Sequence, residues 1–77
     1  SEQRTLVIFE SPNRIQKTLR DLLKAFGNRQ IAIARELTKM HEEVIRSNLE
    51  DLANQERKWR GELTLVIAGL NIKKRKD

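Results

Sequence analysis

Apolar residues fall in four short runs along the chain, and two longer stretches between these runs repeat apolar residues at helical spacing. Unbroken runs at Thr5–Phe9 and Ile31–Ala34 are typical of strands that are covered on both faces. Two further runs, Val44–Arg46 and Glu62–Ala68, predict a brief third strand and a fourth strand that ends at Gly69. The apolar pattern therefore predicts one small sheet.

The stretch between the first two strands predicts a helix from Pro12 to Phe26. Ser11 is a suitable N-cap, and Pro12 suits the first helical position because it has no N–H to leave unpaired. Gly27 can adopt the left-handed conformation that ends a helix. The apolar residues of this stretch lie on one helical face: Ile15, Leu19, Leu22, Leu23 and Phe26.

A second, shorter helix is expected after the third strand. Ser47 and Glu50 have the spacing of a capping box, which opens a helix at Ser47, and Gln55–Gly61 follows as a polar turn. The apolar residues expected to point inward from this helix are Leu49, Leu52 and Ala53.

The resulting order of elements is β-α-β-β-α-β. Both helices need a sheet face to cover them, so the order predicts an α/β fold: a small open-faced sandwich with a mixed sheet. The chain of 77 residues has no internal repeat and no linker. We expect one domain over residues 1–70 and a basic, disordered tail over residues 71–77.

Composition narrows the class of protein. The chain is 38% hydrophobic and 35% charged, which is typical of a globular domain. Cysteine is absent, which excludes disulfides and thiolate chemistry and fits a reducing compartment. No apolar run approaches the roughly 20 residues of a membrane span. We therefore expect a soluble, cytoplasmic protein with no membrane partner.

The net charge of +5 points to an anionic partner such as RNA. Much of the excess is local, however, at the tail cations Lys73–Lys76 and at the basic residues that flank Trp59. Trp59 could stack on a base or act as a hydrophobic plug beneath the last turn, and we favour the plug.

Several kinds of site are disfavoured. His41 is the only histidine, so one chain cannot supply a histidine-rich metal site, and we expect no metal. The three glycines do not have the spacing of a phosphate-binding loop. The chain is therefore not a self-sufficient nucleotide site.

The densely charged stretch Arg35–Glu43 follows the second strand and fits neither a helical nor a strand period. It is either a solvated loop or, because ligands bind at the carboxyl ends of strands in open α/β sheets, part of a site. Glu10–Arg14 occupies the corresponding place after the first strand. We interpret Arg35–Glu43 as a functional loop or strand edge.

Three segments carry a resemblance to a known family: Leu6–Arg14 (LVIFESPNR), Ala34–Glu43 (ARELTKMHEE) and Arg60–Gly69 (RGELTLVIAG). In order and spacing they resemble the carboxyl-terminal half of the ribosomal RNA small-subunit methyltransferase I group, of which the Ala34–Glu43 string is the most specific part. That group belongs to the tetrapyrrole (corrin/porphyrin) methylase superfamily and methylates a cytidine ribose 2′-hydroxyl.

The resemblance implies a fragment of a two-domain enzyme that is inactive alone and that contributes half of an S-adenosylmethionine cleft. The missing amino-terminal domain, small-subunit ribosomal RNA and a second copy of the full-length protein are the implied partners. The implied RNA contacts are Arg14, Lys39 and His41. Glu36 and His41 are candidates for the catalytic base, because both titrate and lie in the motif. The implied cofactor-binding residues are Ala34, Arg35, Glu36, Leu37 and Thr38.

Two alternatives remain at this stage. A relative in the same superfamily could methylate a tetrapyrrole ring instead of RNA. A non-enzymatic RNA-binding module is also possible, but it should expose aromatic residues on its sheet, and the pattern places Phe9 in a buried run and Phe26 on the apolar face of a helix.

Overall fold

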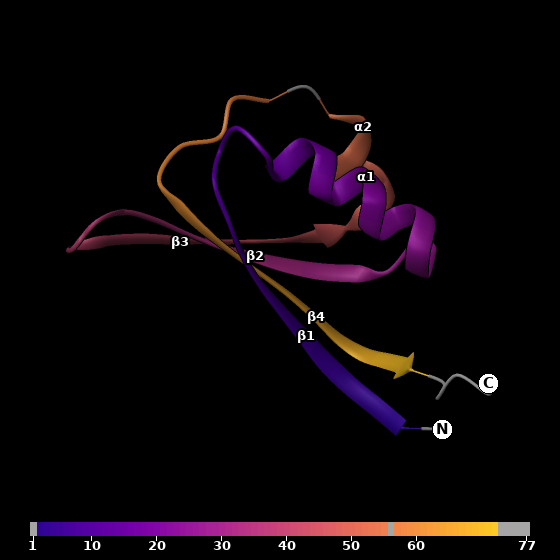
Figure 1. Ribbon diagram of the computed structural model, residues 1–77. Coiled ribbons are helices and arrows are strands. Elements are labelled where there is room, and N and C mark those ends of the chain that lie inside the picture. The colour runs from indigo at the N-terminus through magenta and orange to yellow at the C-terminus, as the bar shows by residue number, and fades with distance from the viewer. Residues whose placement is uncertain (1, 56, 73–77) are drawn as a thin grey trace.

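The computed structural model describes residues 2–55 and 57–72, and its elements follow the predicted β-α-β-β-α-β order (Figure 1). The predicted tail overlaps the last strand at Asn71 and Ile72, whereas residues 73–77 lie outside the described residues. The elements are β1 (Glu2–Glu10), α1 (Ile15–Phe26), β2 (Gln30–Thr38), β3 (His41–Asn48), α2 (Leu49–Asn54) and β4 (Glu62–Ile72).

The four strands form one sheet in the order β1-β4-β2-β3, and every neighbouring pair is antiparallel. The prediction of a mixed sheet is therefore wrong. β1 and β2 do run in the same direction, as expected for strands joined by a helix, but β4 lies between them and pairs with both. The insertion of β4 removes the parallel pair from the sheet.

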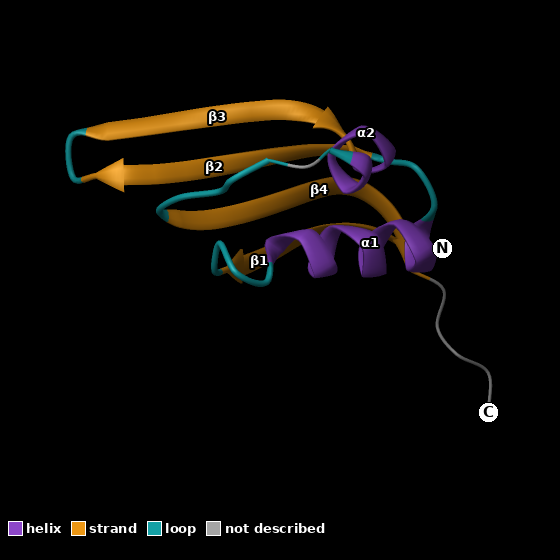
Figure 2. Ribbon diagram, turned by 90° about the horizontal axis from the view of Figure 1, so that it is seen from above, coloured by secondary structure: helices purple, strands orange, loops and turns teal. Residues whose placement is uncertain are grey.

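Both helices cover the same face of the sheet, which confirms the open-faced sandwich (Figure 2). Alternate residues of the strands point into this layer, as the two-residue period of a strand requires. Burying such side chains stabilises a fold by about 1.5–3 kcal/mol each. The core side chains are Ile15, Leu19, Leu22, Ile31, Ile33, Leu49, Leu52, Ala53, Trp59, Leu63, Leu65 and Ile67.

On the other face of the sheet, the described part of the chain places no helix. Val7 is 49% exposed and Phe9 is 79% exposed on it, whereas Leu6 and Ile8 pack against the core from the covered face. The prediction that Thr5–Phe9 is covered on both faces, with Phe9 buried, is wrong. An unbroken apolar run does not distinguish a strand buried on both sides from one whose second face is left apolar and open.

The charged stretch after the second predicted strand is a hairpin and not a loop. β2 continues to Thr38 and β3 begins at His41, so only Lys39 and Met40 lie outside the strands. In Figure 1 this hairpin projects from the body of the molecule. Its charged side chains are compatible with strand because both faces of the projecting part are largely exposed, so no apolar alternation is required.

The helix starts differ from the predicted caps. α1 begins at Ile15 and not at Pro12, and its first turn is closed through the carbonyl of Ser11, which accepts from the N–H of Arg14 and of Ile15. The N-cap residue is Arg14, whose side chain makes no capping hydrogen bond, so the predicted Ser11 cap is wrong. Gly27, at φ +75°, ends the helix as expected.

At α2 the cap is one residue later than predicted. The side chain of Asn48 accepts a hydrogen bond from the N–H of Asp51 at 2.8 Å, which makes Asn48 the N-cap in place of Ser47. Asn28 adds a second acceptor for this short helix, because its Oδ1 accepts from the N–H of Glu50 at 2.9 Å. Asparagine caps satisfy the free donors of a first turn as well as serine does.

The last strand passes through Gly69 and does not end there. Ala68 and Gly69 together face Thr5 in the register between β1 and β4, so this place is a β-bulge. The φ of +74° at Gly69 fits the glycine that such bulges favour. Sequence alone does not separate a glycine that ends a strand from one that bends it.

Candidate functional site

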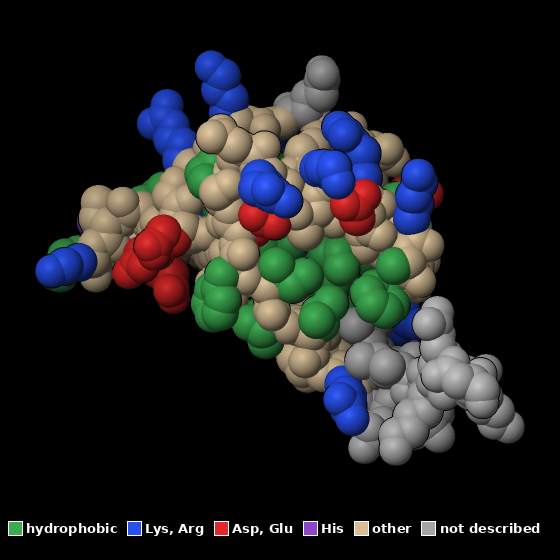
Figure 3. Space-filling view, viewed as in Figure 1, with side chains coloured by type: hydrophobic (Ala, Val, Ile, Leu, Met, Phe, Trp, Pro, Cys, Tyr) green, Lys and Arg blue, Asp and Glu red, His purple; other side chains and the backbone are tan. Residues whose placement is uncertain are grey.

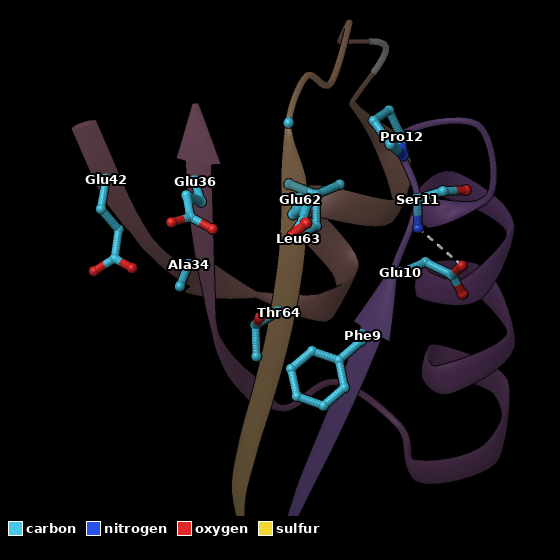
Figure 4. A pocket seen from close by; sticks show the side chains of 11 residues that line it. Phe9, Glu10, Ser11, Pro12, Ala34, Glu36, Glu42, Glu62, Leu63 and Thr64 are labelled. Carbon is cyan, nitrogen blue, oxygen red and sulfur yellow. Dashed lines mark hydrogen bonds between the residues drawn. The ribbon is translucent and has the colours of Figure 1, made fainter. Parts of the chain in front are cut away.

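A hollow of about 620 Å³ opens on the uncovered face of the sheet, where β1 and β2 end and β4 begins (Figure 4). Residues from all four strands and from the β1–α1 connection contribute to it. The lining residues are Phe9, Glu10, Ser11, Pro12, Ala34, Glu36, Glu42, Gly61, Glu62, Leu63 and Thr64.

Three carboxylates form a row across this hollow. Glu36 of β2 lies opposite Glu42 of β3 on one side and opposite Glu62 of β4 on the other, so all three side chains share the open face. Like charges placed directly opposite destabilise a sheet. Within residues 2–55 and 57–72 no lysine or arginine forms an ion pair with any of the three. The row therefore favours a positively charged group from outside the described residues.

An aromatic ring and short side chains lie beside the carboxylate row. Phe9 of β1 lies opposite Thr64 of β4, which in turn lies opposite Ala34 of β2. The short side chains leave the Phe9 ring uncovered, as its 79% exposure shows. Figure 4 shows the ring in this hollow. Such a surface suits the face of a planar ring, held by stacking.

Gly61 lets the end of β2 approach the start of β4. A Cβ atom at Gly61 would lie 2.2 Å from the carbonyl oxygen of Glu36, and the φ of +79° is itself unfavourable for other residues. The glycine thus holds the backbone of Glu36 close to that of Glu62. Sequence reasoning placed Gly61 at a turn and missed this role, because the close approach exists only in three dimensions.

Glu10 is a lining residue whose side chain is held in place by hydrogen bonds. Its carboxylate accepts hydrogen bonds from Thr18 Oγ1 at 2.6 Å and from the N–H of Ser11 at 3.1 Å, and Arg14 Nε lies 3.7 Å away. The Thr18 hydroxyl first, then the Ser11 N–H and the Arg14 charge, lower the pKa of Glu10. Its side chain, 15% exposed, joins the end of β1 to α1.

The structure brings together only part of the predicted cofactor-binding set. Ala34 and Glu36 line the hollow. Arg35 points to the opposite face, where it pairs with Glu43. Leu37 and Thr38 lie beyond the rim, and the Thr38 hydroxyl accepts from the N–H of Met40 at 3.2 Å. Successive side chains of a strand point to opposite faces, so Arg35 and Glu36 cannot line the same hollow, as they could have done in a loop.

The predicted RNA contacts and the second base candidate lie elsewhere. Lys39 and His41 are at the tip of the β2–β3 hairpin. His41 lines a different hollow at this tip, and neither residue lines the main hollow. Arg14 has a 74% exposed side chain beside Glu10. Of the two base candidates, Glu36 alone lies in the main hollow.

Sequence reasoning missed several lining residues, among them Phe9, Glu42, Glu62 and Thr64. The two-residue period of a strand predicts which residues of β2 share a face with Glu36. Extending that face to β1, β3 and β4 requires the register between the strands. Trp59 is 7% exposed and its Nε1 donates to Gln16, so the prediction of a hydrophobic plug is confirmed.

The sequence profile of the tetrapyrrole (corrin/porphyrin) methylases matches residues 1–53, which is more than half of the chain. The chain belongs to the tetrapyrrole methylase family. The matched region includes β1, α1, β2 and β3, and hence Phe9, Ala34, Glu36 and Glu42 of the hollow.

Curated relatives are named ribosomal RNA small subunit methyltransferase I. The protein from Thermotoga maritima is 43% identical over 70 residues, which cover 88% of this chain and 32% of the relative. The Mycobacterium bovis protein is 47% identical over 74 residues, covering 88% and 25%. The Bacillus subtilis protein is 40% identical over 72 residues, covering 90% and 24%.

The chain thus spans between about a quarter and a third of the length of these relatives. The tetrapyrrole methylase resemblance noted in the sequence is confirmed by the profile match and by these relatives. Within the part of the chain that the structure describes, no helix is both long and apolar enough to cross a bilayer.

Proposed function

We propose that this chain is the carboxyl-terminal domain of a methyltransferase that modifies small-subunit ribosomal RNA, with residues 1–70 supplying one wall of an S-adenosylmethionine cleft. The observation that carries the proposal is the hollow in which an exposed aromatic ring lies beside three carboxylates that have no ion-pair partner among the residues the structure describes. The names of the relatives supply the reaction and substrate class.

The chemistry of the lining residues fits this cofactor. S-Adenosylmethionine supplies a methyl group on a positively charged sulfur and also carries a planar adenine and an ammonium group. The carboxylates of Glu36, Glu42 and Glu62 favour the cationic part, and the Phe9 ring beside Ala34 suits the adenine. We expect Glu36 to matter most, because it is the central member of the row.

The proposed acceptor is the 2′-hydroxyl of a cytidine ribose. Transfer to a hydroxyl needs in-line positioning and a group that takes the proton. Glu36 is the better candidate for that base, since it lies in the hollow whereas His41 lies at the hairpin tip.

The open face favours completion by another part of the protein. Val7, Phe9 and Val44 are each at least 49% exposed on one side of the sheet, and the relatives are three to four times longer than the matched region. We propose that an amino-terminal domain closes the cleft over this face. A homodimer of the full-length protein and a cytoplasmic location are part of the same proposal.

The two alternatives are less favoured. A tetrapyrrole substrate fits the family description but not the names of the relatives. Exposure of Phe9 removes one objection to a non-enzymatic RNA-binding module. However, such sheets use two or three stacked aromatic residues, and the carboxylates around Phe9 repel phosphate groups.

A chimera tests the proposal. The matched region of the Thermotoga maritima relative is replaced by residues 1–70 of this chain, and ribose methylation of small-subunit ribosomal RNA is measured by mass spectrometry. We expect the chimera to methylate a cytidine 2′-hydroxyl and to lose activity with Glu36→Gln.

The matched control is Glu43→Gln, which removes a carboxylate from the opposite face of the same hairpin and should retain activity. A folded chimera that binds S-adenosylmethionine but leaves the RNA unmethylated would contradict the proposed substrate. A folded chimera that does not bind the cofactor would contradict the proposed cleft.

A further inference from the structure

A second hollow, of about 690 Å³, lies on the helical side of the molecule. It is bounded by one side of α1, by the end of α2 and by the connection to β4, and among residues 2–55 and 57–72 no carboxylate lines it. We call it the basic groove. Its lining residues are Pro12, Gln16, Arg20, Ala53, Asn54, Gln55, Arg57, Lys58 and Trp59.

Gln16 holds the floor of the basic groove in place. Its side-chain nitrogen donates to the carbonyls of Leu52 and Ala53, each at 2.9 Å, and so satisfies the last turn of α2. Its side-chain oxygen accepts from Trp59 Nε1 at 3.4 Å. One amide therefore joins α1, α2 and the connection to β4, which gives the groove a fixed shape.

Trp59 serves as a support and is not open to a base. The side chain is 7% exposed, and the guanidinium of Arg57 lies over its ring at 4.8 Å from the centroid. This cation–π contact also fixes the position of the Arg57 charge. The basic groove therefore offers positioned cations without a stacking surface, which suits a phosphate group and not a nucleobase.

Three cations surround the basic groove: Arg20 from α1, and Arg57 and Lys58 from the connection. All three side chains are exposed, and none forms an ion pair with a carboxylate of the described residues. Lys17 on the same helix, by contrast, pairs with Asp21 at 3.1 Å. Figure 3 shows lysine and arginine side chains gathered over the part of the molecule where the helices lie.

The basic groove adjoins the hollow on the open face. Pro12, in the turn between β1 and α1, lines both. A strand of RNA held in the groove by its phosphates can therefore pass over this turn and present a ribose to the other hollow. Contacts to phosphates fix the register of a nucleic acid without reading its sequence.

We propose that the basic groove binds the phosphodiester backbone of the RNA substrate through Arg20, Arg57 and Lys58. The choice of RNA among polyanions rests on the proposed function. The site differs from the RNA contacts expected from the sequence, Arg14, Lys39 and His41, because none of these lines the groove.

The test measures binding of the 77-residue chain to a fluorescein-labelled hairpin RNA from small-subunit ribosomal RNA at several salt concentrations. The groove variant carries Arg20→Gln, Arg57→Gln and Lys58→Gln. The matched control carries Arg4→Gln, Lys24→Gln and Arg46→Gln, which remove the same charge from exposed positions elsewhere. Circular dichroism melts establish that both variants fold.

We expect the groove variant to bind about 10- to 100-fold more weakly than the parent chain at low salt, and to lower the slope of log K against log salt by about 2 to 3. The control should weaken binding only a few-fold. In the parent chain, RNA should shift the backbone amide resonances of Gln16, Arg20 and Ala53–Trp59 most.

Equal loss of affinity in the two variants would overturn the proposal, because binding would then depend on net charge alone. Unchanged affinity in the groove variant, or RNA-induced shifts confined to the hairpin tip, would overturn it too. So would binding to anionic lipid vesicles without binding to RNA. The assay contains no S-adenosylmethionine, so its failure is distinct from failure of the cofactor cleft.

Discussion

The two hollows meet at Pro12 but differ in charge and in construction. Among the described residues, the lining on the open face carries Glu10, Glu36, Glu42 and Glu62, and no lysine or arginine. The lining of the basic groove carries three cations and, within residues 2–55 and 57–72, no carboxylate. A ligand with a positive centre and a polyanion would thus occupy adjoining sites. The charges of each site repel the ligand of the other site. The net charge of +5 is a sum over the whole chain and does not reveal that two sites of opposite charge lie side by side.

The two hollows also depend on different kinds of interaction. The open-face hollow is built by strand register, which lines up alternate side chains of four strands. The basic groove is built by hydrogen bonds of one side chain, Gln16, to backbone and to Trp59. Substitutions can therefore disturb one hollow and leave the other intact.

The largest effect is expected from Gly61→Ala. The new Cβ would meet the Glu36 carbonyl oxygen at 2.2 Å in a backbone conformation at φ +79°. Backbone strain and overpacking together should lower the free energy of unfolding by about 2–5 kcal/mol, as measured by urea denaturation.

Gly69→Ala is the matched control for Gly61→Ala. Gly69 also has a positive φ, +74°, but apart from its chain neighbours no described atom lies within 4 Å of its would-be Cβ. The Gly69→Ala substitution should therefore lower the free energy of unfolding through backbone strain alone, by about 1–3 kcal/mol. Equal losses in the two variants would show that the close approach of β2 and β4 does not matter.

Gln16→Met should disturb the basic groove and leave the open-face hollow in place. Methionine keeps the volume but cannot donate to the Leu52 and Ala53 carbonyls or accept from Trp59. We expect a loss of about 1–3 kcal/mol in stability and weaker RNA binding. Gln30→Met, at an exposed position outside the basic groove, should change stability by less than about 0.5 kcal/mol. A stable Gln16→Met protein with unchanged RNA affinity would contradict the role given to Gln16.

Smaller effects of opposite sign are expected from two carboxylates of the β2–β3 hairpin. Glu36→Gln removes one of three facing like charges and should raise stability by about 0.2–1 kcal/mol, while weakening S-adenosylmethionine binding. Glu43→Gln weakens the ion pair with Arg35 and should lower stability by about 0.5–1 kcal/mol. If both variants lose stability, the row on the open face is not strained by repulsion.

The smallest effect concerns pH and Glu10. The Thr18 hydroxyl, the Ser11 N–H and the Arg14 charge lower the folded-state pKa of Glu10. A lowered pKa adds stability above the ordinary glutamate pKa, and this stability is lost as pH falls through the folded value. Thr18→Val should therefore destabilise the chain at neutral pH and by less in acid, measured by denaturation at each pH. Thr5→Val, at an exposed position, should show no such pH dependence.

The sequence was informative where one local pattern decides the structure. The apolar face of α1 and the β-α-β-β-α-β order of elements follow from spacing alone, and the interpretation of Trp59 as a plug is confirmed. The same patterns could not reveal that β4 inserts between β1 and β2, because strand order depends on contacts between distant segments.

The candidate site was only partly accessible for the same reason. Ala34 and Glu36 were expected at the cleft through resemblance, and they do line the hollow. Arg35, between them in sequence, points to the other face because strand residues alternate. Phe9 and Glu62 join the hollow only through the register of β4 with β1 and β2.

The most direct test of the central claim is one NMR titration of the 77-residue chain with S-adenosylmethionine and, separately and together, with the hairpin RNA. We predict that the cofactor shifts amides around Phe9, Ala34, Glu36 and Thr64 most, that RNA shifts those of the basic groove most, and that the largest shifts from each ligand stay in its own hollow when both are present. S-Adenosylhomocysteine, which lacks the positive charge on sulfur, should bind more weakly. A single set of shifts common to the cofactor and the RNA would contradict the assignment of the two hollows to ligands of opposite charge.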